Sequence, residues 1–254
     1  MSISMIKTLK IFLLILIPLT AVSQQNIKDS VLSFPMIGAS GAWQIPGGDL
    51  SDRFGNNFNI GGVFQWKTKK NIVLGIDGQF LFGNKIKEDN ILDSITTIQG
   101  GIISAQGEFA DVLLYERGIK FEFKAGKIFP VFGPNKNSGI MTTLGVGILQ
   151  HKIRIENTGS SIPSIEGDYK KGYDRLSNGL SLTAFAGYMN FGNKRLVNFY
   201  AGFEITQAFT QNRRAFNFDT REQDLRKRTD LLIGIRIGWV LPIYKRAPRE
   251  FYYN

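Results

Sequence analysis

Hydrophobic residues alternate with small or polar residues over long stretches of this sequence. Between residues 58 and 67, the apolar residues Phe58, Ile60, Phe64 and Trp66 all fall on one of the two alternating faces. A period of two residues is that of a β-strand. The same alternation recurs over residues 72–82, 119–126, 197–206 and 231–241. The pattern therefore predicts an all-β protein.

The second face of these strands is rich in glycine and carries charged residues in mid-strand. These charged residues are Asp77, Lys120, Glu122, Lys124, Glu204 and Arg236. The runs are also about as long as a bilayer-crossing strand, which takes roughly 9–11 residues. Apolar side chains that face lipid around a narrow polar interior explain both features. The pattern favours a transmembrane β-barrel over a soluble secreted β-sandwich, whose strands also alternate.

The connections between strands sort into short and long ones. With three weaker runs at residues 34–43, 139–155 and 180–191, the predicted strands number eight. Short connections at 69–71, 132–138 and 192–195 alternate with long ones at 45–57, 83–114, 157–179 and 212–230. This predicts an antiparallel up-and-down barrel with periplasmic turns, long outer loops and both termini in the periplasm.

Aromatic residues near one end of several runs predict an interfacial girdle where the barrel leaves the membrane. They are Trp66, Phe129, Tyr188, Phe199, Trp239 and Tyr244.

The start of the chain has the features of a secretory signal peptide. Lys7 and Lys10 precede an apolar run over residues 11–19, and small residues follow at 21–23. We therefore expect a cleaved leader at 1–23 and a short periplasmic segment at 24–33. The barrel is expected at 34–244, followed by a periplasmic tail at 245–254.

Composition excludes several classes of site. The 254 residues include no cysteine and one histidine, and 31 basic against 21 acidic residues give a formal charge of +10. Disulfides, cysteine-ligated zinc, cysteine nucleophiles and paired-histidine sites are thereby excluded. We expect no cofactor and no metal site, and export argues against nucleic acid as the partner of the basic surface.

The mid-strand charges are expected to pair inside the barrel. Glu204 and Arg236 each lie eight positions from the predicted periplasmic ends of neighbouring strands, at residues 196 and 244, so they should face each other. By the same reasoning Asp77 should lie near Lys124, and Glu122 lies between the two lysines of its own strand. An eight-stranded barrel is filled by its side chains. An internal ion-pair network is therefore favoured over a proton or ion path.

The single histidine, His151, is predicted near the outer end of the fifth strand. A lipid hydrolase or lipid A deacylase with a serine nucleophile would have to use it as the base. No serine stands beside it, the nearest being Ser160 and Ser161 in a loop, although Glu156 or Asp168 could orient the ring. A histidine at the barrel rim is the favoured interpretation, and the hydrolase remains the alternative.

Two basic segments suggest partners. The first is an outer loop whose cations could contact lipopolysaccharide phosphates or could simply be solvated. Its residues are Arg213, Arg214, Arg221, Arg226, Lys227 and Arg228. The second is the tail, whose basic and aromatic residues could dock a protein partner in the periplasm or fold back onto the barrel rim. Its residues are Arg246, Arg249, Phe251, Tyr252 and Tyr253.

The sequence resembles small outer-membrane β-barrel proteins of Bacteroidota. The resemblance covers residues 34–244 and includes the strand segments 115–121 and 236–239, although the chain continues about ten residues past Tyr244. Among such proteins, PorG-like barrels of the type IX secretion and gliding machinery serve as accessory anchors for periplasmic rings. The resemblance implies a non-enzymatic structural or accessory subunit in the outer membrane. A lipid-modifying enzyme that uses His151 and a narrow solute channel are the alternatives.

Overall fold

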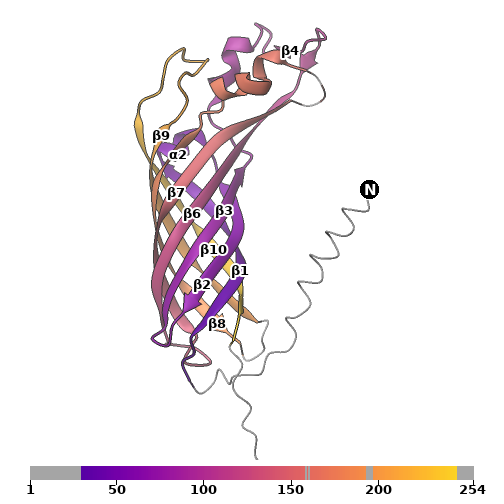
Figure 1. Ribbon diagram of the computed structural model, residues 1–254. Helices are drawn as coiled ribbons and strands as arrows, with labels where there is room; N and C mark the ends of the chain where they lie inside the picture. The colour runs from indigo at the N-terminus through magenta and orange to yellow at the C-terminus, as the bar shows by residue number, and fades with distance from the viewer. Residues whose placement is uncertain (1–29, 158, 160, 193–196, 245–254) are drawn as a thin grey trace, which may run out of the picture.

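The computed structural model describes residues 30–157, 159, 161–192 and 197–244. Within this part of the chain, eight antiparallel strands close into an up-and-down barrel (Figure 1). They are β1 (Phe34–Gly48), β2 (Asn57–Lys67), β3 (Ile72–Gly83), β6 (Val112–Phe129), β7 (Gly139–Asn157), β8 (Ser177–Phe191), β9 (Asn198–Asn212) and β10 (Lys227–Pro242). Each strand pairs with the next, and β1 pairs with β10 to close the ring. The predicted fold class is confirmed.

The two faces of every strand differ as the alternation predicts. Phe58, Ile60 and Phe64 of β2 point outward and are exposed, whereas Asn59 and Gln65 point into the lumen and are buried. The outer wall is therefore apolar and the interior carries the polar groups.

The first strand is longer than the sequence predicts. It continues past Trp43 through Pro46 and ends at Gly48, because Pro46 pairs in register with Leu232 of β10. Proline and glycine usually mark a loop, but pairing with the last strand overrides that local signal. The strand predicted at 180–191 likewise begins earlier, at Ser177, where β8 starts.

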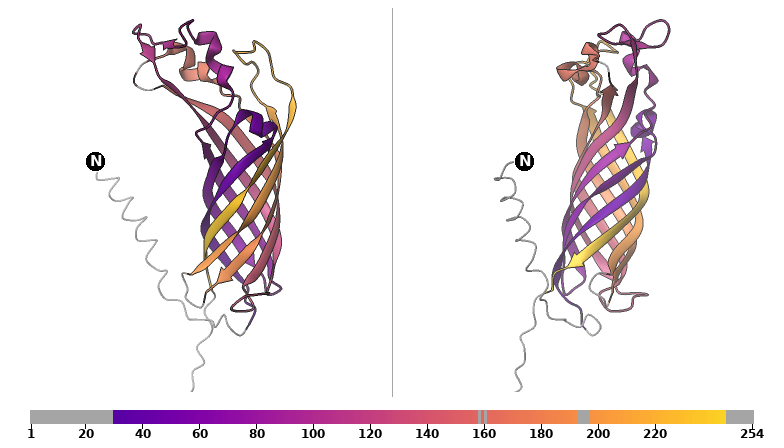
Figure 2. Two further views of the ribbon diagram at one scale, coloured as in Figure 1. Left: turned by 180° about the vertical axis from the view of Figure 1, so that it is seen from behind. Right: turned by 90° about the vertical axis from the view of Figure 1, so that its right-hand side faces the viewer.

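The two ends of the barrel differ (Figure 2). At the short-turn end lie the β2–β3, β6–β7 and β8–β9 connections, the start of β1 and the end of β10. At the long-loop end lie the other four connections. These hold α2 (Asp49–Arg53), η2 (Asp89–Ile95), the hairpin β4 (Ile102–Ile103) with β5 (Phe109–Ala110), η3 (Pro163–Ile165) and η4 (Gly167–Gly172). No helix of the described chain is long and apolar enough to cross a membrane.

Strands β6 and β7 extend past the barrel rim at the long-loop end (Figure 1). The pairing of β3 with β6 ends at Glu116, and the pairing of β8 with β7 ends at His151. Beyond these points residues 112–115 of β6 pair with residues 154–157 of β7, and residues 152 and 153 pair with Arg117 and Glu116 at the base of this extension. We call residues 112–115 and 152–157 the β6–β7 arm.

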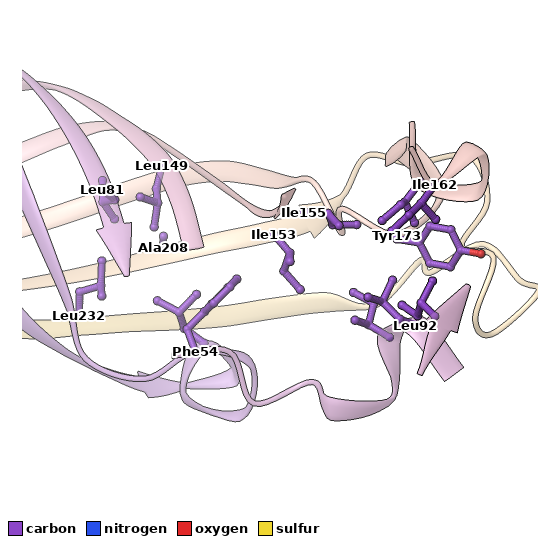
Figure 3. Close-up of a cluster of buried hydrophobic side chains, with 14 residues drawn as sticks. Phe54, Leu81, Leu92, Leu149, Ile153, Ile155, Ile162, Tyr173, Ala208 and Leu232 are labelled. Carbon is purple, nitrogen blue, oxygen red and sulfur yellow. The ribbon is translucent and has the colours of Figure 1, made fainter. Parts of the chain in front are cut away.

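Two apolar clusters fill opposite ends of the molecule. The short-turn cluster includes Phe34, Met36, Met189 and Phe191. The long-loop cluster begins in the barrel mouth and continues between the arm and the loops (Figure 3). Its buried residues are Leu50, Phe54, Leu81, Ile91, Leu92, Ile102, Leu149, Ile153, Ile155, Ile162, Ile165, Tyr173, Ala208 and Leu232. The long loops thus share one apolar core with the barrel mouth.

The predicted aromatic girdle is present with one exception. Trp66, Phe129, Phe199 and Trp239 are exposed on the outer wall near the short-turn end, whereas Tyr244 is buried. The ring of Tyr244 packs edge-on against Phe34, with the centroids 4.9 Å apart. Its assignment to the girdle is wrong because it continues the inward-facing side of β10. The remaining member, Tyr188, is half-buried and donates a hydrogen bond from its hydroxyl to the carbonyl of Phe132.

Candidate functional site

A layer of six charged side chains crosses the lumen between the two apolar clusters. Along β10, for example, Arg236 stands between Val240 of the short-turn cluster and Leu232 of the long-loop cluster. The six residues are Asp77, Lys120, Glu122, Lys124, Glu204 and Arg236. The layer contains three carboxylates and three cations, so its formal net charge is zero. Each buried charge can therefore have a partner of opposite sign, which offsets the cost of removing it from water.

Glu204 is the most connected member of this layer. Its carboxylate lies 2.6 Å from Nε of Arg236, 3.1 Å from Nζ of Lys120 and 3.4 Å from Nζ of Lys124. The structure therefore brings Glu204 and Arg236 together across neighbouring strands, at the equal depth that the sequence predicts.

The remaining carboxylates also contact lysines. Asp77 Oδ2 lies 2.5 Å from Nζ of Lys124. Glu122 lies 3.4 Å from Lys120 and 3.3 Å from Lys124, its neighbours on the same face of β6. The predicted pairs thus all occur in one connected group.

Neutral side chains surround the charges and form hydrogen bonds with several of them. Arg236 donates to Ser40 Oγ at 2.9 Å and to Asn59 Oδ1 at 3.3 Å, which links β10 to β1 and β2. Thr183 of β8 donates to Glu122, and Lys120 donates to Thr206 of β9 at 3.1 Å. The network joins seven of the eight barrel strands.

The eighth strand, β7, contributes space instead of a polar group. Gly145 and Gly147 face the lumen beside the lysine and glutamate of β6. A Cβ atom on Gly145 would lie 3.1 Å from Cγ of Lys124, and one on Gly147 would lie 2.7 Å from Cα of Glu122. The two glycines therefore make room for the charged layer.

His151 belongs to a second polar group nearer the long-loop end. Its Nε2 lies 2.9 Å from Oδ2 of Asp230, which also accepts a hydrogen bond from Thr210 at 2.5 Å. The ring packs edge-on against Phe54 and is only 1% exposed. Nδ1 has no hydrogen-bond partner among the described residues. No serine of the described residues forms a hydrogen bond with this imidazole.

Arginine–carboxylate pairs tie the long loops together above the mouth. Arg53 Nε lies 2.5 Å from Glu88, and Arg175 bridges Glu88 at 3.0 Å and Asp219 at 2.5 Å. A cavity of about 250 Å³ lies among these groups. It is lined by Asp49, Asp52, Arg53, Glu88, Arg175, Arg226 and Arg228.

Asp224 holds the last long loop. Arg226 Nε lies 3.2 Å from its Oδ1, and Arg228 donates to its Oδ2. Burial alone would raise the pKa of Asp224, but hydrogen bonds from both guanidinium groups lower this pKa well below its ordinary value. The same contact raises the pKa of Arg226.

The comparisons with known proteins show likeness of fold alone. The chain matches no family model and no curated protein. Solved structures do have a similar fold. Neisserial surface protein A is 12% identical, with 81% of this chain and 96% of that chain covered and a TM-score of 0.41. Ail, the attachment invasion locus protein of Yersinia pestis, is 10% identical, with 82% and 97% covered and a TM-score of 0.38. The N-terminal β-barrel domain of Pseudomonas aeruginosa OprF is 11% identical, with 83% and 100% covered and a TM-score of 0.37.

The predicted loop cations are not equally available to a ligand. Arg213 donates to Asn178, and Arg214 pairs with Asp174 at 2.5 Å. Arg226 and Arg228 share Asp224, as described above. The remaining two, Arg221 and Lys227, are exposed. The tail residues Arg246, Arg249, Phe251, Tyr252 and Tyr253 lie outside the described residues.

The structure places His151 at the level of the barrel rim, where the pairing of β7 with β8 ends. Its side chain points inward and is buried, because it shares the inward face of β7 with Leu149. The carboxylate beside it is Asp230 and neither Glu156 nor Asp168. Asp168 is exposed and pairs with Lys171, a contact that lowers the pKa of its carboxyl group.

Sequence reasoning missed several functional side chains, and one of them had a usable signal. Asp230 stands six positions before Arg236, so it falls on the same inward face of β10. Its assignment to the preceding loop concealed this. Arg53 and Arg175 carried no such signal, because they lie in connections between strands, where apolar and polar residues do not alternate.

Proposed function

We propose that this protein is an integral β-barrel of the bacterial outer membrane that acts as a structural or accessory subunit of the cell envelope. The observation that carries the membrane location is the distribution of side chains. All eight strands expose large apolar residues on the outer wall, while charged groups are buried in the lumen. This inverts the usual arrangement of a water-soluble protein and matches a barrel in lipid.

The proposed orientation places the short-turn end in the periplasm. Short turns at one end and long loops at the other are the usual arrangement of outer-membrane barrels. The start of β1 and the end of β10, which are the first and last strands of the described chain, both lie at this end. Export would depend on the proposed leader at 1–23, and the tail at 245–254 would enter the periplasm.

The accessory role is proposed because the loops and the tail are the parts of the protein that remain available to bind a partner. Side chains fill the lumen in apolar and charged layers, which leaves the loops and the tail to contact partners. Ile98, Ile103 and Phe109 in the β3–β6 connection expose apolar side chains that a partner could cover. The resemblance to PorG-like barrels further supports a role beside a type IX secretion complex.

The membrane location can be tested by expressing the full chain in a Gram-negative host. We expect it in the outer-membrane fraction, resistant to extraction by alkaline carbonate. Its mobility on SDS gels should change on boiling, since a closed barrel resists SDS at room temperature. Recovery as a soluble periplasmic protein would overturn the proposal.

The accessory role can be tested by co-purification. We would place an affinity tag in the exposed turn at Gly107, extract with mild detergent and identify associated proteins by mass spectrometry. We expect a stoichiometric complex that is lost when residues 245–254 are deleted. An Ile103→Ser/Phe109→Ser variant tests the loops in the same way. A monomer that carries only lipid would overturn the accessory role while leaving the membrane location intact.

The alternative of a lipid hydrolase has a direct test. The imidazole of His151 is buried among lumen side chains and contacts Asp230, where a lipid chain has no path to it. We expect wild type and His151→Ala to be equally inactive on phospholipid and lipid A. Turnover by the wild type that His151→Ala abolishes would establish the enzyme instead.

A further inference from the structure

Three basic side chains from β6 and β7 lie together on the outer wall of the barrel. Arg117 and Lys152 are register partners across these two strands, and Arg154 is the next outward residue on β7. The alternate residues Gly118, His151 and Ile153 face inward and are buried. We call Arg117, Lys152 and Arg154 the basic wall cluster, because its side chains point to the surroundings and not to the lumen.

The basic wall cluster lies just beyond the apolar wall on the same two strands. Ile119 of β6 and Ile148 of β7 are exposed on this face. Lys152 lies four positions after Ile148 along β7. At about 3.3 Å per residue and a strand tilt of about 40°, Lys152 lies about 10 Å further along the barrel axis. For a barrel whose apolar wall is in hydrocarbon, that distance places the cluster at the level of the lipid phosphates.

The positive charge of the cluster is only partly neutralised within the described chain. Arg154 pairs with Glu156 at 2.6 Å, and its side chain is still 54% exposed. Arg117 is held over the ring of Tyr115, with its Cζ atom 4.9 Å from the ring centroid. No carboxylate of the described residues forms an ion pair with Arg117 or Lys152. The cluster therefore presents surplus positive charge in a fixed place.

We propose that the basic wall cluster binds the phosphate groups of an anionic lipid in the leaflet on the long-loop side. The proposal rests on the membrane location proposed above and moves the lipid contact from the β9–β10 loop to the wall of β6 and β7. Guanidinium groups bind phosphate oxygens through paired hydrogen bonds, and lysine adds a mobile charge. The acyl chains of the same lipid would lie against Ile119, Ile148 and their outward neighbours.

The proposal is tested with a charge-neutral triple variant and a matched control. The variant is Arg117→Gln/Lys152→Gln/Arg154→Gln, and the control is Lys69→Gln/Lys70→Gln/Lys136→Gln. The control removes the same number of cations from exposed positions at the short-turn end. Each protein is purified at full length and placed in phosphatidylcholine nanodiscs that contain either bisphosphorylated lipid A or its fully dephosphorylated form. Native mass spectrometry then counts the retained lipid A.

We expect wild type and control to retain the bisphosphorylated lipid and not the dephosphorylated one. The cluster variant should bind the bisphosphorylated lipid about tenfold more weakly or worse. Equal retention of both lipids by wild type, or equal loss in both triple variants, would overturn the proposal. Displacement of the lipid by millimolar inorganic phosphate would overturn it in favour of a free-anion site. Binding of soluble polyglutamate without lipid preference would overturn it in favour of an acidic protein partner.

A separate measurement distinguishes this proposal from the membrane location itself. All three proteins are first floated with phosphatidylcholine vesicles and checked for a change of gel mobility on heating. If wild type floats but shows no preference for phosphate, the cluster proposal alone fails. If wild type does not float, the membrane location fails and the lipid site fails with it.

Discussion

At the scale of single residues, Glu204 is the acidic residue that makes the most ion pairs in the charged layer of the lumen. Its carboxylate contacts Arg236, Lys120 and Lys124, and it is fully buried. A buried charge that loses its partner costs more than the intact pair contributes, because the remaining ion keeps its desolvation penalty. Single substitutions in this layer should therefore be far more damaging than the exchange of a complete pair.

We predict that Arg236→Leu lowers the free energy of unfolding by about 3–5 kcal/mol. The change leaves Glu204 without its bidentate partner and removes the donor to Ser40 and Asn59. The measurement is the temperature at which the folded band disappears on heating in SDS. The double variant Arg236→Leu/Glu204→Gln should recover part of the loss, since the layer is again neutral. An unfolding temperature equal to that of wild type, or of the exposed-site control Lys69→Leu, would contradict the pairing.

Asp224 yields a prediction about pH. The pKa of Asp224 is lower in the folded protein than its ordinary value of 3.8, so its contribution to loop stability is fully present above that value. It is lost as the pH falls through the lower, folded pKa. The amide of Arg226, which donates to Asp224 Oδ1 at 3.1 Å, reports this directly. Its hydrogen-exchange protection factor should stay constant from about pH 8 to about pH 4 and fall only below that range.

The same loop offers an internal control for this measurement. The backbone N–H of Arg214 donates to Oδ1 of Asn212 at 2.7 Å. The side-chain carboxamide of Asn212 does not titrate, unlike the carboxyl group of Asp224. The protection of the Arg214 N–H should not change with pH. In Asp224→Asn, protection at Arg226 should be reduced at every pH. Loss of protection at Arg226 already near pH 5 would show that the carboxyl group is not held in its charged form.

At the scale of elements, the β6–β7 arm is an extension whose stability depends on the loops around it. Ile153 and Ile155 point from the arm into the long-loop cluster, which also contains Ile162, Ile165 and Leu92 of the loops. A two-stranded ribbon is marginal by itself in water. The loops and the arm therefore order one another.

Ile155→Ala should loosen the arm and leave the barrel intact. Removing a buried isoleucine side chain costs about 2–5 kcal/mol, and here that cost falls on local opening. Trypsin cleavage after Lys152 or Arg154 should accelerate about tenfold or more, while the unfolding temperature in SDS stays at the wild-type value. The control is Ile148→Ala, an outward residue of the same strand. Equal cleavage of both variants would show that the cluster does not hold the arm.

Elements also show what could be predicted from sequence and what could not. The period of two residues predicted eight strands, their order and the inward position of the lumen charges, because burial on one face enforces that period. The end of β1 was missed, since Pro46 and Gly47 are held by pairing with β10 and not by local preference. The partner of His151 was missed because Asp230 sits where β10 emerges from its loop. The contacts of Arg53 and Arg175 depend on loop conformations that carry no period at all.

At the scale of the whole molecule, the lumen is closed by layers of different chemistry. The short-turn cluster is apolar and the six charges follow it. Leu149, Ala208 and Leu232 of the long-loop cluster come next, and they separate the charges from His151 and Asp230. An ion that crossed the barrel would have to leave water for both apolar layers. The filled interior accords with the side-chain packing expected of an eight-stranded barrel.

We therefore predict no steady single-channel conductance for the purified protein in a planar bilayer. Insertion should be verified separately by vesicle flotation, so that a protein that has not inserted is not mistaken for a closed barrel. Val63→Gly/Val73→Gly, which thins the short-turn cluster, tests whether that layer is part of the seal. Steady, voltage-independent conductance by the wild type would contradict the closed lumen and favour the solute channel.

The hydrogen bonds of Arg236 have a consequence for how the barrel is made. Arg236 lies in the last strand to be synthesised, and two of its acceptors, Ser40 and Asn59, lie in the first two strands. Until the first and last strands meet, its guanidinium group lacks these acceptors while Glu204 already holds it from the neighbouring strand. Closing the seam and completing the charged layer are therefore one event. An unclosed sheet therefore lacks the hydrogen bonds of Arg236 to Ser40 and Asn59 in the lumen, as well as the backbone pairing of β1 with β10 at its edges.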